Sequence, residues 1–292
     1  MGKGAVKFNG EKFKVKEEYS TYVGTQLRLE IQSKNIKEIS EIKGLNKLKK
    51  LTALNLSNNE ITQIQGLEVL PNLQQLFLNN NKIIEISGLE TLTNIDRIFL
   101  NGNQITEISC LEKLLKLQWL ELNDNKISEI KGLENQNDLV KLTFKNNQIS
   151  EIANLDKLQN LQVLTLSRNQ ITEIKNLEKL TSLHSLFLDH NKITEITGLD
   201  KLINLNVLHL DNNQISEIKG LDTLTELENL QLDSNQLTEL KGLDNLKKLS
   251  CLTMGMNKFE GEAQKFAPFT VLGEDNIQKL LESYREWKQA NS

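Results

Sequence analysis

The sequence has few of the features that export, anchor or cross-link a chain. It contains two cysteines in 292 residues, Cys110 and Cys251, which lie far apart in the repeat array described below, so we expect both to be reduced thiols. No apolar run approaches the length that spans a membrane, and the first residues contain no apolar segment typical of a signal peptide. These absences favour a cytoplasmic protein that does not associate with membranes.

The sequence also lacks the residues that common catalytic or nucleic-acid-binding sites need. The net charge is −4, which gives no electrostatic reason to expect nucleic acid as a partner. The three histidines are His184, His190 and His209, and no serine or cysteine is placed by the pattern to use one as a base. No glycine-rich phosphate loop is visible. We therefore predict no enzyme and no cofactor.

What the sequence does have is an internal repeat of 22 residues without insertion or deletion. Its clearest marker is an asparagine that recurs in every copy: Asn59, Asn81, Asn103, Asn125, Asn147, Asn169, Asn191, Asn213, Asn235 and Asn257. A fixed period of this length is typical of a solenoid, in which each copy buries its apolar face only against its neighbours.

Each part of the repeat has a structural role, as the copy that begins at Leu70 illustrates. The LxxLxL half, residues 73–78, predicts a short strand, because alternate side chains of a strand point to opposite faces. The IxxIxxLxxL half, residues 83–92, has a spacing of three that suits a 3₁₀ or irregular turn. The asparagine at the corner, Asn81, can bond backbone groups that neither half satisfies. Stacked copies therefore predict a buried ladder of hydrogen-bonded asparagines.

A second corner in each copy calls for a left-handed backbone. Glycine precedes the turn leucine in most copies, and Asn154, Asn176 and Cys110 take its place in three. Glycine and asparagine accept this conformation most readily, so either Cys110 is a slightly strained exception or the turn there differs.

Three segments follow from this organisation. Residues 1–24 are predicted to be an N-terminal cap with a β-hairpin turning at Asn9–Gly10. Residues 25–258 are the array of about eleven repeats. Residues 259–292 contain a predicted helix, Glu274–Ala290, with Asp275 as its N-cap. The apolar stripe of this helix predicts a C-terminal cap, although an amphipathic helix that docks on a partner or a membrane would have the same pattern.

The motif LxxLxLxxNxIxxIxGLxxL resembles that of the leucine-rich repeat family in its 22-residue form. The phrases IKGLE, IKNLEKL and ITGLDKL are similar to the repeat-built regulatory subunit of protein phosphatase 1, and the repeat resembles bacterial internalins less closely. The resemblance implies an α/β solenoid: a right-handed horseshoe with a parallel β-sheet on its concave face and 3₁₀ or irregular turns on its convex face. It also implies a non-catalytic scaffold that binds a protein on the concave strands. Phe77, Phe99 and Glu121 match the aromatic and acidic positions of the phosphatase subunit, but Thr143 and Thr165 then depart from them.

Strand alternation identifies the side chains that face outward. One predicted binding patch is contributed by three neighbouring strands: Phe77, Arg97, Phe99, Trp119 and Glu121. Aromatic residues beside an arginine are typical of interface hot spots, whereas aromatics scattered singly on a surface would have no such meaning.

A second predicted patch lies further along the array and is mainly acidic. Its members are Phe187, Asp189, His209, Asp211 and Asp233. The carboxylates beside an imidazole could hold a divalent cation or a basic partner, or they could be a solvated strip. Calcium needs six or more oxygens, so the site prediction includes no metal.

The sequence leaves three functions open. The first is a cytoplasmic protein-binding scaffold. The second is a regulatory subunit of a Ser/Thr phosphatase, and the third is a surface or secreted adhesin similar to internalins. The secretion signal, helical cap and wall-anchoring tail of internalins are not visible here, which favours the first two.

Overall fold

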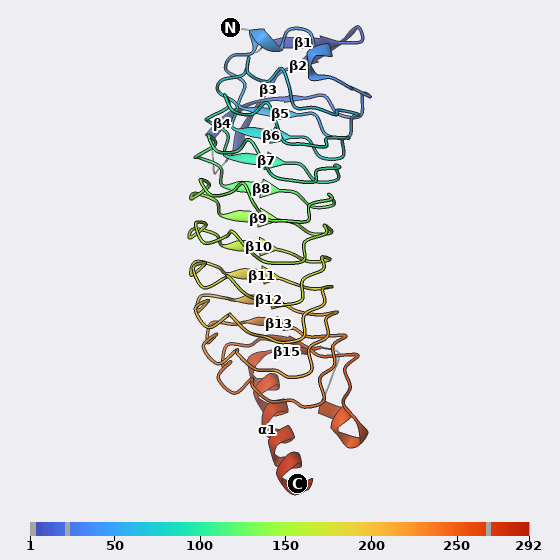
Figure 1. Cartoon of the computed structure of the whole chain (residues 1–292), viewed down its shortest axis with the longest axis vertical. Helices are drawn as coiled ribbons and strands as arrows, with labels where there is room; N and C mark the ends of the chain where they lie inside the picture. The colour runs from blue at the N-terminus through green and yellow to red at the C-terminus, as the bar shows by residue number, and fades with distance from the viewer. Residues whose placement is uncertain (1–3, 21–23, 267–269, 292) are drawn as a thin grey trace. The chain divides into compact units, whose positions relative to one another are not determined.

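The computed structural model describes residues 4–20, 24–266 and 270–291. The chain is a parallel-strand β-solenoid of about ten turns, which confirms the predicted solenoid, for which the sequence predicted about eleven repeats. It divides into two compact units, residues 1–147 and 148–292, and Figure 1 shows the coils stacked within each of them. The predicted terminal segments include residues 1–3, 21–23, 267–269 and 292, which lie outside the described residues.

The first unit begins with antiparallel strands and continues with parallel ones. Strands β1 (Ala5–Phe8) and β2 (Glu11–Lys14) form the predicted hairpin, and β3 (Lys16–Ser20) pairs antiparallel with β4 (Gly24–Glu30). Two 3₁₀ turns follow, η1 (Ile39–Glu41) and η2 (Leu45–Lys47). Five parallel strands then stack on β4 in register: β5 (Ala53–Asn55), β6 (Gln75–Phe77), β7 (Arg97–Phe99), β8 (Trp119–Glu121) and β9 (Lys141–Thr143).

The second unit has the same parallel coils and ends in a helix. Its parallel strands are β10 (Val163–Thr165), β11 (Ser185–Phe187), β12 (Val207–His209), β13 (Asn229–Gln231) and β14 (Cys251–Thr253). The 3₁₀ turn η3 (Gly261–Phe266) follows, and β15 (Val271–Leu272) pairs antiparallel with β14. Helix α1 (Glu274–Asn291) confirms the predicted helix. Its first hydrogen bond runs from Ile277 N to Gly273 O, so Asp275 lies in the first turn and its prediction as the N-cap is wrong.

The motif leucines and isoleucines form the core of each coil. In strand β6 the central Leu76 is fully buried while Phe77 is partly exposed, which follows from the alternation of side chains along a strand. Complete burial of one leucine stabilises the fold by about 1.5–3 kcal/mol. One position breaks the pattern: Gln136 stands where the neighbouring coils have leucine, and it is also completely buried. The repeat alone did not identify it as a polar core residue.

The predicted asparagine ladder is present in both units. Asn103 is representative: its amide nitrogen donates to Leu78 O of the preceding coil at 3.0 Å and to Leu100 O of its own coil at 2.9 Å, and its oxygen accepts from Ile83 N at 3.1 Å. The buried amide thereby satisfies three backbone groups that the short strands and turns leave open. Each asparagine joins two successive coils.

The predicted left-handed backbone conformation at the residue before the turn leucine, which is usually glycine, is also confirmed. At Gly88 φ is +72°, and an added Cβ would lie 1.9 Å from Ile64 O of the coil before. Cys110 takes the same conformation with φ 58°, so it is the strained exception rather than a different turn.

The residue before each ladder asparagine forms a further left-handed corner, which we did not predict. Its members differ in type and all have positive φ: Asn58, Asn80, Gly102, Asp124, Asn146, Arg168, His190, Asn212, Ser234 and Met256.

Candidate functional site

Three aromatic side chains lie on the outward face of neighbouring strands in the first unit. Phe77, Phe99 and Trp119 come from β6, β7 and β8, and each is partly exposed. The core lies on the opposite side of these strands, where Ile98 and Leu120 are fully buried. The fold therefore does not require an aromatic residue at any of the three positions.

The first two aromatic rings are stacked. The ring centroids of Phe77 and Phe99 are 4.5 Å apart and their planes differ by 3°, because the two residues are register partners in parallel strands. The guanidinium carbon of Arg28 lies 4.8 Å from the centroid of Phe77. Stacking and cation–π contacts of this kind hold the rings in one orientation.

The third aromatic residue lies between two cations. The guanidinium carbon of Arg97 is 4.3 Å from the Trp119 ring centroid, and Lys141 Nζ is 5.3 Å from it. Lys141 also forms an ion pair of 2.7 Å with Glu121, which in turn accepts a hydrogen bond from Asn101. We call Arg28, Phe77, Arg97, Phe99, Trp119, Glu121 and Lys141 the aromatic strip.

The structure thus brings together all five residues predicted for this patch and adds two. Arg28 and Lys141 were missed because their strands, β4 and β9, lie outside the three that carry the aromatic residues, although both belong to the same outward-facing column as Arg97 and Trp119. Each of them has a carboxylate neighbour: Arg28 lies 3.0 Å from Glu30, and Lys141 pairs with Glu121. The centre of the strip therefore consists of flat aromatic rings. The basic side chains of Arg28 and Lys141 at its two ends are each paired with a carboxylate.

Arg97 of the strip forms a partly buried pair with Asp96. Asp96 Oδ1 lies 3.6 Å from Arg97 Nε. Burial raises the pKa of the Asp96 carboxyl, and the charge of Arg97 opposes this change. The ion pair therefore helps to keep Arg97 over the indole of Trp119.

The second predicted patch lies on the strands of the second unit. The rings of Phe187 and His209, also register partners, meet edge to face with centroids 4.8 Å apart. Burial lowers the pKa of His209, although the charges of Asp211 and Asp189 act in the opposite direction. His209 is accordingly neutral near pH 7.

The three predicted aspartates follow these strands but do not share one environment. Asp189 accepts a hydrogen bond from the Ser167 hydroxyl. Asp233 accepts hydrogen bonds from the Thr253 hydroxyl and, at 2.7 Å, from Gly255 N. The imidazole that contacts the carboxylates is that of His190, whose Nδ1 is 3.1 Å from Asp189 Oδ2 and 3.9 Å from Asp211 Oδ2. The sequence predicted His209 on the same face as these carboxylates, and their charges do act on it, but it did not predict the nearer imidazole of His190.

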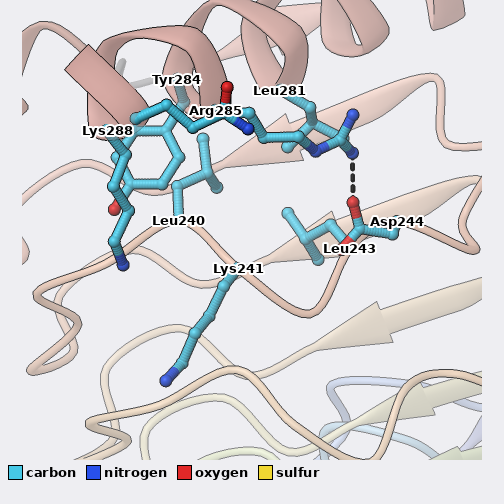
Figure 2. A pocket seen from close by; sticks show the side chains of 9 residues that line it. Leu240, Lys241, Leu243, Asp244, Leu281, Tyr284, Arg285 and Lys288 are labelled. Atoms are coloured by element: carbon cyan, nitrogen blue, oxygen red, sulfur yellow. Dashed lines mark hydrogen bonds and ion pairs between the residues drawn. The ribbon is translucent and has the colours of Figure 1, made fainter. Parts of the chain in front are cut away.

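A pocket of about 350 Å³ lies where helix α1 meets the coils before it. Leu240, Leu243, Leu281 and Tyr284 form its apolar lining, and Figure 2 shows Arg285 of the helix reaching Asp244 of the coil. Lys288 similarly lies 2.8 Å from Glu239. These contacts and the burial of Ile277, Leu281 and Tyr284 attach α1 to the second unit.

Comparison with known proteins identifies the protein family to which the chain belongs. Residues 71–113, 159–201 and 181–223 match the family described as leucine rich repeats (2 copies), and residues 28–83 match the family described as leucine rich repeat. The chain therefore belongs to the leucine-rich repeat family. No curated protein sequence matches it.

Among solved structures, several internalins of Listeria monocytogenes are similar. The internalin InlF is 31% identical with a TM-score of 0.68, and the match covers 81% of this chain and 75% of that one. Internalin C2 is 31% identical with a TM-score of 0.59, covering 69% of this chain and 89% of that one. InlJ is 26% identical with a TM-score of 0.67, covering 80% and 49%. These matches support the internalin resemblance, whereas the phosphatase resemblance stays a prediction.

Proposed function

We propose that the chain is a non-catalytic scaffold that binds a protein partner through the aromatic strip of its first unit. The single observation that carries this proposal is the ordered stack of aromatic and cationic side chains on an outward strand face. Aromatic and arginine side chains that are already fixed lose little conformational entropy when a partner covers them. Leucine-rich repeat proteins generally act as interaction scaffolds, which is consistent with this role.

The test compares capture of partners by the wild type and by a Phe99→Ala/Trp119→Ala double variant in extracts of the source cells. We expect proteins recovered with the wild type to be lost with the double variant. The matched control is Leu115→Ala, which removes an exposed apolar side chain elsewhere in the same unit and should change nothing. Equal recovery of every protein by wild type and double variant would contradict the proposal.

A phosphatase role is a narrower form of this proposal. Phe77, Phe99 and Glu121 carry the resemblance to the phosphatase-regulating subunit, and they lie together in the strip. Titration calorimetry with a purified catalytic subunit of protein phosphatase 1 tests it directly. Absence of binding would reject the phosphatase role and leave the scaffold proposal standing.

An adhesin is the second candidate, and the similarity to InlF favours it. The two candidates differ in where the protein acts. We propose the cytoplasm, because Cys110 and Cys251 are free thiols. Fractionation of the source cells with an antibody against the chain separates the two: recovery at the cell surface or in the medium would favour the adhesin.

A further inference from the structure

We propose that Asp189, His190 and Asp211 form a binding site for a divalent transition-metal ion, with Zn²⁺ as the best match. One donor atom from each residue, two carboxylate oxygens and one imidazole nitrogen, lies within 4.8 Å of the other two. The site is in the second unit and is independent of the aromatic strip.

The backbone explains why the three side chains meet. Asp189 and Asp211 lie two residues after β11 and β12, which are paired in register, so their carboxylates stand on adjacent coils. His190 occupies the left-handed corner that precedes the ladder asparagine, with φ 54°. This conformation directs its ring back along the strand face, toward the carboxylate of its own coil and that of the next.

The separations between donors fit a small ion. His190 Nδ1 is 3.1 Å from Asp189 Oδ2 and 3.9 Å from Asp211 Oδ2. Tetrahedral zinc binds nitrogen and oxygen at about 2.0–2.2 Å, which places its ligands roughly 3.4 Å from one another. The donor atoms lie within 4.8 Å of one another, so the partly exposed side chains would have to close the widest separation by up to about 1.4 Å to reach these bonds.

The charge around the donors is suited to a cation. Among the described residues, the ion pairs of Asp189 and Asp211 involve His190 and no lysine or arginine. His209, the last residue of β12, has a buried Nε2 without a hydrogen-bond partner in the described part of the chain. Asp189 accepts a hydrogen bond from the Ser167 hydroxyl, and Asp211 Oδ2 accepts one from Asn212 Nδ2 at 2.8 Å. A cation would neutralise the charge of these two carboxylates, which neutral donors leave in place.

The kinds of ligand atom in this cluster, carboxylate oxygen and imidazole nitrogen, determine which metal ions it prefers. Imidazole together with carboxylate suits zinc and related transition metals. Calcium requires six to eight oxygen ligands, and this cluster supplies oxygen from only two carboxylates. Three protein ligands leave a fourth position for water or for a carboxylate or imidazole of a partner.

The experiment is calorimetric titration of the full chain, first treated with chelator, with ZnCl₂ and in parallel with CaCl₂. We expect one zinc ion per chain and no comparable calcium binding. His190→Asn retains a residue that accepts the left-handed corner, as Asn212 does one coil later, and should weaken zinc binding at least tenfold. Asp211→Asn should do the same, whereas the matched control Asp233→Asn should stay within twofold of the wild type.

A second readout separates this site from general binding by surface carboxylates. Zinc should raise the melting temperature of the wild type and of Asp233→Asn, because an ion that binds only the folded state stabilises it, but not that of His190→Asn. No zinc binding at millimolar concentration, equal binding by all variants, or preference for calcium would each overturn the proposal.

Discussion

Phe77 and Phe99 stack face to face on neighbouring strands with their ring planes only 3° apart, yet neither ring belongs to the core. The contrast with Phe144 is instructive, because that phenylalanine occupies a motif leucine position and is completely buried. Two residues of the same type in one unit thus have different roles, which mutation can separate.

The first prediction uses this contrast. Phe99→Ala should lower the free energy of unfolding by about 1 kcal/mol, the value of an aromatic pair contact on a surface. Phe144→Ala should lower it by about 3–5 kcal/mol, because it leaves a cavity in the core. Urea unfolding followed by circular dichroism measures both. A loss at Phe99 as large as that at Phe144 would mean that the strip is structural.

The second prediction concerns Gln136, the polar residue in the leucine position of its coil. Its Nε2 donates to Leu111 O at 2.6 Å, but that carbonyl already accepts from Leu114 N, and Gln136 Oε1 has no partner among the described residues. Gln136→Leu should therefore stabilise the protein by about 1–2 kcal/mol, since an unsatisfied buried polar atom is removed. The check is a higher urea midpoint, with Gln136→Ala as the control that removes the amide without filling the space. An unchanged or lower midpoint for Gln136→Leu would show that the amide is needed.

The third prediction tests the asparagine ladder. Asn103→Ala removes an acceptor for Ile83 N and a donor to two carbonyls, so it should cost about 3 kcal/mol, because buried backbone groups lose their partners. Asn72→Ala is the matched control: Asn72 also bonds a backbone carbonyl, Lys49 O at 2.7 Å, but it is exposed. It should cost under about 1 kcal/mol, since water replaces the lost bond. Similar losses for the two variants would argue against the ladder as a main source of stability.

These residues also show how far the sequence predicts the structure. The spacing of Asn103 and its equivalents was enough to predict the coils, the ladder and the outward-facing columns, because one geometry is imposed on every copy. Gln136 departs from the consensus, and only the structure shows that its side chain remains inside. His190 lies in a corner without a consensus residue type, so alternation along the strand could not place its ring beside Asp189 and Asp211.

The fourth prediction follows from that corner. Arg168 has φ 55°, a conformation that a long side chain adopts at a cost and that asparagine or glycine adopts more readily. Arg168→Asn should raise the free energy of unfolding by about 0.5–1 kcal/mol. Arg168→Lys, which keeps the charge and the strain, should change it little. A gain with lysine equal to that with asparagine would assign the effect to loss of the arginine side chain rather than to relief of the backbone conformation.

The last prediction concerns pH and His209. Burial lowers the pKa of this imidazole in the folded chain, so between the folded value and the unfolded value of about 6.5 the unfolded chain binds more protons. The contribution of His209 to stability is therefore complete above about pH 6.5 and declines as the pH falls toward the folded pKa. The difference in unfolding free energy between the wild type and His209→Gln, measured at several pH values, isolates this contribution. If that difference were constant over the acidic range, or if the wild type gained on acidification relative to the variant, the imidazole would not be held neutral by its burial beside Phe187.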